Sequence, residues 1–170
     1  ITPAGVVSTH ATGSGNGTNE LTSVVVNKNN GNIYWSDFYG DGVYTLKNGT
    51  ITRVINYSLP CTITIDAQGN IYATHYDAHT VRKYTYNAGN DSFDNGVDYA
   101  GKNGQSGLVD GIGDNARFNR PFGIAVDAGN NVYVCGLGED RNSNCVRMIN
   151  PARNVTTIAG AAERGYAEGT

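Results

Sequence analysis

Charge, cysteine and long apolar runs are all scarce in this sequence. Only 16% of its 170 residues are charged, and the formal net charge is −3 with a pI near 5.5. An acidic chain has no overall electrostatic attraction to nucleic acid or to anionic lipid, so we expect neither as a partner. The apolar runs are far shorter than the roughly 18 residues that a membrane helix needs, so we expect no membrane span.

Cysteine is also rare, because the chain has only three. That number is odd and too small for a disulfide scaffold. Cys135 and Cys145 flank one polar loop, and the sequence leaves open whether they are bridged or free; Cys61 is expected to be a small core residue. Low charge together with abundant Asn, Thr, Gly and Tyr is typical of exported bacterial proteins. We therefore expect an extracellular, periplasmic or cell-surface location.

The sequence does contain a repeated hairpin. Its clearest copy has two apolar runs, residues 123–126 (GIAV) and 132–134 (VYV), separated by the turn-forming residues 127–131 (DAGNN). β-Branched and aromatic residues on both sides of such a turn predict two antiparallel strands. Further apolar runs at 146–149 and 155–158 supply a third and a fourth strand. A sheet this small cannot bury both faces alone, so it needs similar sheets as neighbours.

Two more copies of the hairpin precede this one, at residues 24–35 and 63–73. Asn27, Asp66 and Asp127 occupy equivalent positions, so the repeat recurs after 39 and then 61 residues. We attribute the longer second step to extra loop. Repeats of about 40 residues with four strands each predict a β-propeller. The expected extra loop lies at residues 87–95 and 101–115.

The sequence resembles NHL-repeat propellers along essentially its whole length. The most specific matches are residues 107–111 (GLVDG), 116–127 (ARFNRPFGIAVD), 131–134 (NVYV), 155–160 (VTTIAG) and 164–170 (RGYAEGT). The resemblance implies an acidic residue at the end of each second strand and a basic partner on the third. Here no blade has both members of that pair. The residues at these positions are Asp37, His75 and Gly136 on second strands and Tyr44, Arg82 and Arg147 on third strands.

The repeat phase predicts an all-β, partial NHL-type propeller of four-stranded antiparallel blades, about three blades plus one strand. We expect the last strand of a preceding blade at 1–17, blades at 18–56, 57–115 (with the long loop) and 116–160, and a lead into a further blade at 161–170. The missing blades would come from the same polypeptide or from another copy. The expected inter-blade core is Ile33, Trp35, Ile63, Ile65, Ile71, Ile124, Val126, Val132 and Val134.

The second strand of the middle blade runs into a loop that carries His75, Tyr76 and His79. Paired imidazoles can bind zinc, but a spacing of four residues brings two side chains together on a helix rather than in a β loop. We therefore expect no bound metal and no cofactor. The resemblance includes metal-dependent lyases that draw histidines from several blades, whereas this chain has one pair, so no catalytic residues are assigned.

The equivalent loop of the first blade carries Phe38 and Tyr39, just beyond Tyr34 and Trp35 on the strand. The strand aromatics are expected to pack between blades, whereas loop aromatics are suited to contact a ligand. The predicted ligand-binding residues are Phe38, Tyr39, His75, Tyr76 and His79. These residues favour a non-catalytic recognition module for a protein or glycan. The alternative is a metal-assisted lyase or hydrolase completed by blades outside this chain, and the fold does not choose between the two.

Overall fold

The protein is a row of β-sheets, seen here in a computed structural model that describes residues 20–39, 42–57, 60–138 and 143–161. The helical structure in this part of the chain is one short 3-10 turn, η1 (Gly113–Asn115). None of the helical structure there is long and apolar enough to cross a membrane. The strand predicted at 1–17 lies outside the described residues, as do residues 162–170 of the lead predicted at 161–170 and the loop centre at 139–142.

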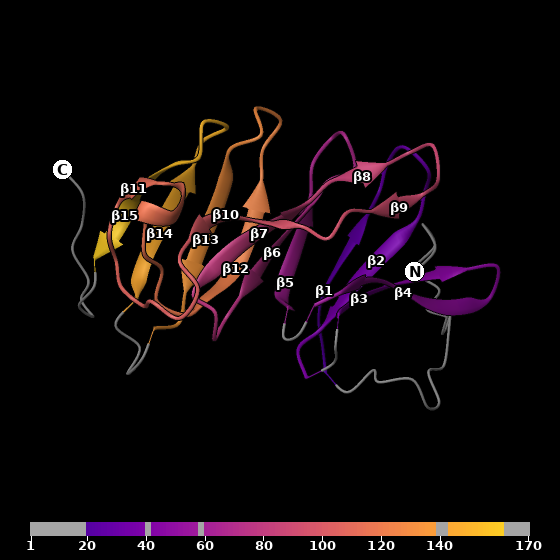
Figure 1. Cartoon of the computed structure of the whole chain (residues 1–170), viewed down its shortest axis with the longest axis horizontal. Coiled ribbons are helices and arrows are strands. Elements are labelled where there is room, and N and C mark those ends of the chain that lie inside the picture. The colour runs from indigo at the N-terminus through magenta and orange to yellow at the C-terminus, as the bar shows by residue number, and fades with distance from the viewer. Residues whose placement is uncertain (1–19, 40–41, 58–59, 139–142, 162–170) are drawn as a thin grey trace, which may run out of the picture.

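Three antiparallel sheets follow one another along the chain (Figure 1). The first has the order β1 (Leu21–Val26), β2 (Ile33–Asp37), β3 (Gly42–Lys47), β4 (Thr50–Asn56). The second has the order β5 (Pro60–Ile65), β6 (Ile71–His75), β7 (Thr80–Tyr84), β10 (Val97–Gly101). The third has the order β12 (Pro121–Val126), β13 (Val132–Gly136), β14 (Asn144–Ile149), β15 (Asn154–Ala161), β11 (Gly111–Ile112).

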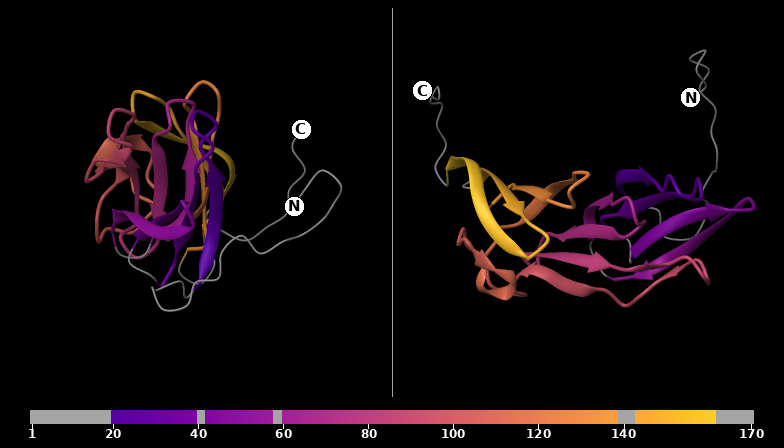
Figure 2. Two further views of the ribbon diagram at one scale, coloured as in Figure 1. Left: turned by 90° about the vertical axis from the view of Figure 1, so that its right-hand side faces the viewer. Right: turned by 90° about the horizontal axis from the view of Figure 1, so that it is seen from above.

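The sheets stand side by side with their first strands adjoining, because β5 contacts both β1 and β12. Figure 2, viewed from above, shows the first and third sheets at opposite ends with the second between them. This is the arrangement of blades in a β-propeller. The predicted all-β fold of four-stranded antiparallel blades is confirmed.

The turns that join first and second strands use one device in all three blades. A side-chain oxygen of Asn27, Asp66 or Asp127 accepts a hydrogen bond from the backbone N–H two residues later, at 2.8–3.0 Å. Short polar side chains close turns in this way because they imitate a backbone carbonyl. The two aspartates therefore have a structural partner in the turn itself.

Two apolar cores fill the spaces between the blades. The predicted core residues Ile63 and Ile71 are buried between the first and second blades, and Val132 and Val134 are buried between the second and third. Around them, Ile65, Ile124 and Val126 are partly buried and pack against these cores. Ile33 and Trp35 are also only partly buried, because they lie on the outer side of the first blade.

The second blade departs from the predicted loops. Its fourth strand, β10, begins thirteen residues after β7 ends, and a small hairpin of β8 (Tyr86–Asn87) and β9 (Ser92–Phe93) occupies the interval. The expected loop at 101–115 likewise contains β11, which adds a fifth strand to the third blade. Loops of this length inside a compact domain commonly carry structure of their own.

The hairpin of β8 and β9 reaches back to the first blade (Figure 1). The ring of Phe93 packs edge to face on Tyr34 with centroids 5.4 Å apart. Asn30 donates a hydrogen bond to the Tyr86 hydroxyl at 2.9 Å, and Lys47 forms an ion pair with Asp91. The insertion therefore ties two blades together.

The arginines on third strands form ion pairs with aspartates that do not lie on second strands. Arg82 forms an ion pair with Asp98 on β10 at 2.9 Å. Arg147 is 2% exposed, and it donates to the Asp110 carboxylate and the Val109 carbonyl, each at 2.7 Å. Both arginines keep a charged partner although their own blades lack the acid of the family pattern.

The three cysteines are free thiols in this structure. Cys61 and Cys145 are buried and Cys135 is exposed. Cys135 pairs in register with Val146, the residue beyond Cys145. Cys61 is therefore the small core residue that the sequence predicts.

Candidate ligand-binding site

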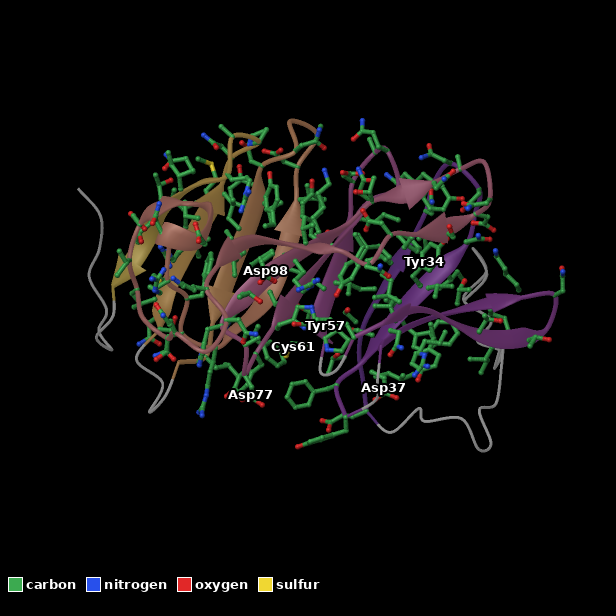
Figure 3. The ribbon with its side chains drawn as sticks, in the orientation of Figure 1. Tyr34, Asp37, Tyr57, Cys61, Asp77 and Asp98 are labelled. Carbon is green, nitrogen blue, oxygen red and sulfur yellow. The ribbon has the colours of Figure 1, made fainter. Side chains whose placement is uncertain are left out.

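Aromatic side chains from two blades meet at one end of the sheets. Phe38 and Tyr39 follow β2, and Tyr76 follows β6, so both turns emerge where second strands end. The ring of Phe38 packs edge to face on Tyr39 at 5.0 Å and on Tyr76 at 6.0 Å between centroids. Figure 3 shows the labelled Asp37, Cys61 and Asp77 at this same end, the lower one in that view.

A basic group from the third blade joins these rings. The guanidinium carbon of Arg120, just before β12, lies 5.2 Å from the centroid of the Tyr76 ring. The backbone N–H of Arg120 donates to His79 Nδ1 at 3.2 Å. We name Phe38, Tyr39, Tyr76, His79 and Arg120 the turn cluster. It draws on all three blades.

The turn cluster is accessible from solvent. Tyr39 is 66% exposed, and Phe38, Tyr76, His79 and Arg120 are partly exposed. His79 and Arg120 have positive φ values, +59° and +49°, which are uncommon for residues other than glycine and asparagine. Such backbone conformations persist only where the surrounding structure holds them in place. Here the hydrogen bond between the two residues contributes to that constraint.

His75 lies apart from the turn cluster because it is buried, at 1% exposure. Its ring packs edge to face against Tyr57 at 4.3 Å, and its Nε2 is 3.3 Å from the Tyr84 hydroxyl. The guanidinium group of Arg82 lies over the Tyr57 ring, with its carbon 4.3 Å from the ring centroid. Burial raises the pKa of Tyr84, so its hydroxyl stays protonated in this cluster. The fold therefore separates His75 from His79.

The buried Cys61 near the turn cluster is in a poor environment for a nucleophile. The Cys61 thiol is buried, and burial together with the charges of Asp77 and Glu20 raises its pKa to about 12. A thiol of such high pKa stays protonated at neutral pH and does not attack substrates. Asp37 is buried and accepts a hydrogen bond from the Glu20 backbone N–H at 3.1 Å.

Metal ligands do not gather within the described residues. In that part of the chain, no group of three or more His, Cys, Asp or Glu side chains lies close enough together to hold an ion. A zinc site needs at least three protein ligands in most enzymes. The absence of a metal from the whole protein stays a prediction.

The structure brings together four of the five predicted site residues, all but His75, and adds Arg120. Sequence reasoning missed Arg120, because its contact with Tyr76 joins residues 44 positions apart and no local pattern encodes such a contact.

No protein-family profile and no curated protein sequence matches the chain. Solved structures do match. An auxiliary nutrient-binding protein from Bacteroides ovatus is 24% identical with a TM-score of 0.69, over 82% of this chain and 36% of that one. A gluconolactonase from Xanthomonas campestris is 13% identical (TM-score 0.59, 85% and 48%), and virginiamycin B lyase from Staphylococcus aureus is 15% identical (0.52, 81% and 40%).

These likenesses show the fold and not the activity, because the sequence identities are low. The chain spans between about a third and a half of the length of each matched protein. One fold therefore serves a binding protein and two enzymes, as is common for propellers.

Proposed function

We propose that this chain is a recognition module that binds a glycan or a protein through the turn cluster. The supporting observation is the meeting of Phe38, Tyr39 and Tyr76 at one exposed end of two blades. Aromatic rings offer a large apolar surface at a small cost in side-chain entropy, and edge-to-face packing holds these rings in place. The Arg120 guanidinium beside Tyr76 adds a donor for the polar groups of a ligand.

Further support comes from position and from likeness. Loops at one end of a rigid scaffold are where binding residues concentrate. The nutrient-binding proteins of Bacteroides have the same fold, and a binding role at or beyond the cell surface agrees with the low-charge, Asn-rich composition. We further propose, from the repeat pattern and the composition, that the protein is an NHL-like propeller with an extracellular, periplasmic or cell-surface location.

An enzymatic role is the second candidate, because a gluconolactonase and a lyase share the fold. The described residues do not include a set of metal ligands for such a role, and the Cys61 thiol is unsuited to act as a nucleophile. A metal-assisted lyase or hydrolase would need metal ligands from residues beyond those described.

The test is a binding screen with immobilised neutral and acidic oligosaccharides and with short peptides. Replacing Tyr39 or Phe38 by alanine should weaken binding of any ligand found by about ten- to a hundredfold, as loss of an aromatic anchor does. Tyr133→Ala is the matched control, since Tyr133 contacts Asp127 at the β12–β13 turn. Equal losses in all three variants, or retained binding in the first two, would contradict the proposal.

A further inference from the structure

The first strand of each blade has a β-bulge at the same place. The register shifts between Leu21 and Ser23, between Pro60 and Ile63, and between Pro121 and Gly123. A bulge releases a backbone group from the ladder and turns it out of the sheet. The bulged residues Thr22, Cys61 and Phe122 are equivalent in the repeat.

The bulge of the second blade is bound by hydroxyls of the first. Ser36 Oγ donates to the Cys61 carbonyl at 3.3 Å, and Thr22 Oγ1 donates to the same oxygen. Ser23 Oγ lies 2.8 Å from Ser36 Oγ and accepts from the Ile63 backbone N–H at 2.8 Å. Polar groups at this blade interface are thereby satisfied.

The bulge of the third blade is also bound by hydroxyls of the second, and the donor shared by both interfaces is the one at the Ser36 position. Thr74 Oγ1 donates to the Phe122 carbonyl at 2.7 Å, and Thr62 Oγ1 donates to it as well. Thr62 and Thr74 occupy the positions of Ser23 and Ser36, and their hydroxyls are 3.2 Å apart. Both interfaces therefore have one hydroxyl pair on the preceding blade and one carbonyl on the following blade.

The outer side of the first blade has the features of a following blade. We name Val24, Val26, Ile33 and Trp35 the leading face. Val24 is 66% exposed, whereas its equivalent in the second blade, Ile63, is 3% exposed against the first blade. Val26 is 50% exposed, whereas its equivalent Ile65 packs against a core. A hollow lined by Leu21, Thr22, Ser23, Val24 and Trp35 lies on this side.

The outer side of the third blade lacks the hydroxyl pair. The positions of Ser23 and Ser36 are taken there by Gly123 and Cys135, which face each other in register. Glycine has no donor, and a thiol donates only weakly. A second copy of this chain would therefore present its third blade without the groups that bind the bulge carbonyl.

We propose that the leading face binds a further four-stranded blade that has serine or threonine at the positions of Ser23 and Ser36. Its hydroxyl at the Ser36 position donates to the Thr22 carbonyl, as Ser36 and Thr74 do at the two described interfaces, and its apolar face covers Val24 and Val26. A second copy of this chain is not the occupant. The inference is independent of the turn cluster, which lies at the ends of the strands rather than on a sheet face.

The experiment gives a second copy the missing hydroxyls. The donor is the 170-residue chain with Gly123→Ser, Cys135→Ser and Val24→Asp. The two serines are introduced together, because a Cβ on Gly123 would come 2.6 Å from Cys135 Sγ. Val24→Asp closes the donor's own leading face, and the single variant Val24→Asp is the matched donor without hydroxyls. The acceptor is the labelled wild-type chain, and sedimentation velocity gives the affinity.

We expect the serine donor to bind the wild-type acceptor about tenfold or more tightly than the matched donor, the size expected of two added hydrogen bonds. Binding should be lost when the acceptor carries Val24→Asp. Equal affinity of the two donors, binding that survives Val24→Asp in the acceptor, or a tight wild-type homodimer would each overturn the proposal. Circular dichroism checks the folding of every variant, and threonines at both positions, copying Thr62 and Thr74, replace the serines if that donor does not fold.

Discussion

Thr74 shows how much one hydroxyl contributes at the scale of a residue. Thr74 is fully buried. Its hydroxyl donates a hydrogen bond to the Phe122 carbonyl at 2.7 Å and accepts one from the Thr62 backbone N–H at 3.1 Å. Thr74→Val keeps the shape of the side chain and leaves buried polar groups with fewer partners, so we expect unfolding to become easier by about 1–3 kcal/mol. Urea denaturation measures the loss.

The matched control is Thr52→Val on β4, where the side chain is exposed. That change should alter the free energy of unfolding by no more than about 0.5 kcal/mol. Losses of similar size in both variants would mean that the contact of Thr74 with the third blade carries no special weight.

The candidate site could be predicted in part at this same scale. Phe38 and Tyr76 stand just after second strands, and the repeat phase alone places them at one end of the molecule. His75 and His79 could not be told apart, because the burial of His75 comes from Tyr57 and Tyr84. Those contacts form only when two blades meet, and a local pattern does not contain them.

At the scale of elements, the hairpin of β8 and β9 can be tested by its two kinds of contact with the first blade. Phe93→Ala removes an edge-to-face partner of Tyr34 and should cost about 1–3 kcal/mol of stability. Asp91→Asn removes the ion pair with Lys47, whose side chains are each 37% exposed, and should cost about 1 kcal/mol or less.

Thermal melts of the two variants compare these effects directly. A larger loss for Asp91→Asn than for Phe93→Ala would show that charge rather than packing holds the hairpin. Unchanged stability in both would show that the hairpin does not contribute to the fold of the first blade.

Strands that follow a short turn could be predicted, and strands that follow an insertion could not. The pairs β5 and β6 and β12 and β13 are joined by turns in which an Asp carboxylate accepts hydrogen bonds from nearby backbone N–H groups. No short turn joins β10 to its partner strand β7, because Val97 pairs with Lys83 across the whole β8–β9 hairpin. The fourth strand of the second blade is therefore encoded by long-range pairing and by the burial of Tyr99 and Ala100.

At the scale of the whole molecule, the two end blades differ from the middle one in how many of their faces are covered. Ile71 and Ala73 of β6 pack in the core with the first blade, and Tyr72 packs in the core with the third. In β1, Val25 contributes to one core, and Val24 and Val26 are exposed. Opening β6 disrupts two cores, whereas opening β1 disrupts one.

Amide hydrogen exchange should therefore proceed from the outer blades inward. We expect the backbone amides of β6 to exchange about tenfold or more slowly than those of β1, because exchange follows the free energy of the local opening. Mass spectrometry of exchanged peptides, at two protein concentrations, measures both strands in one experiment. Since a second copy lacks the hydroxyl pair, the protection of β1 should not rise with concentration. Slow exchange in β1 at the lower concentration, equal to that in β6, would mean that the leading face is already covered in the isolated chain.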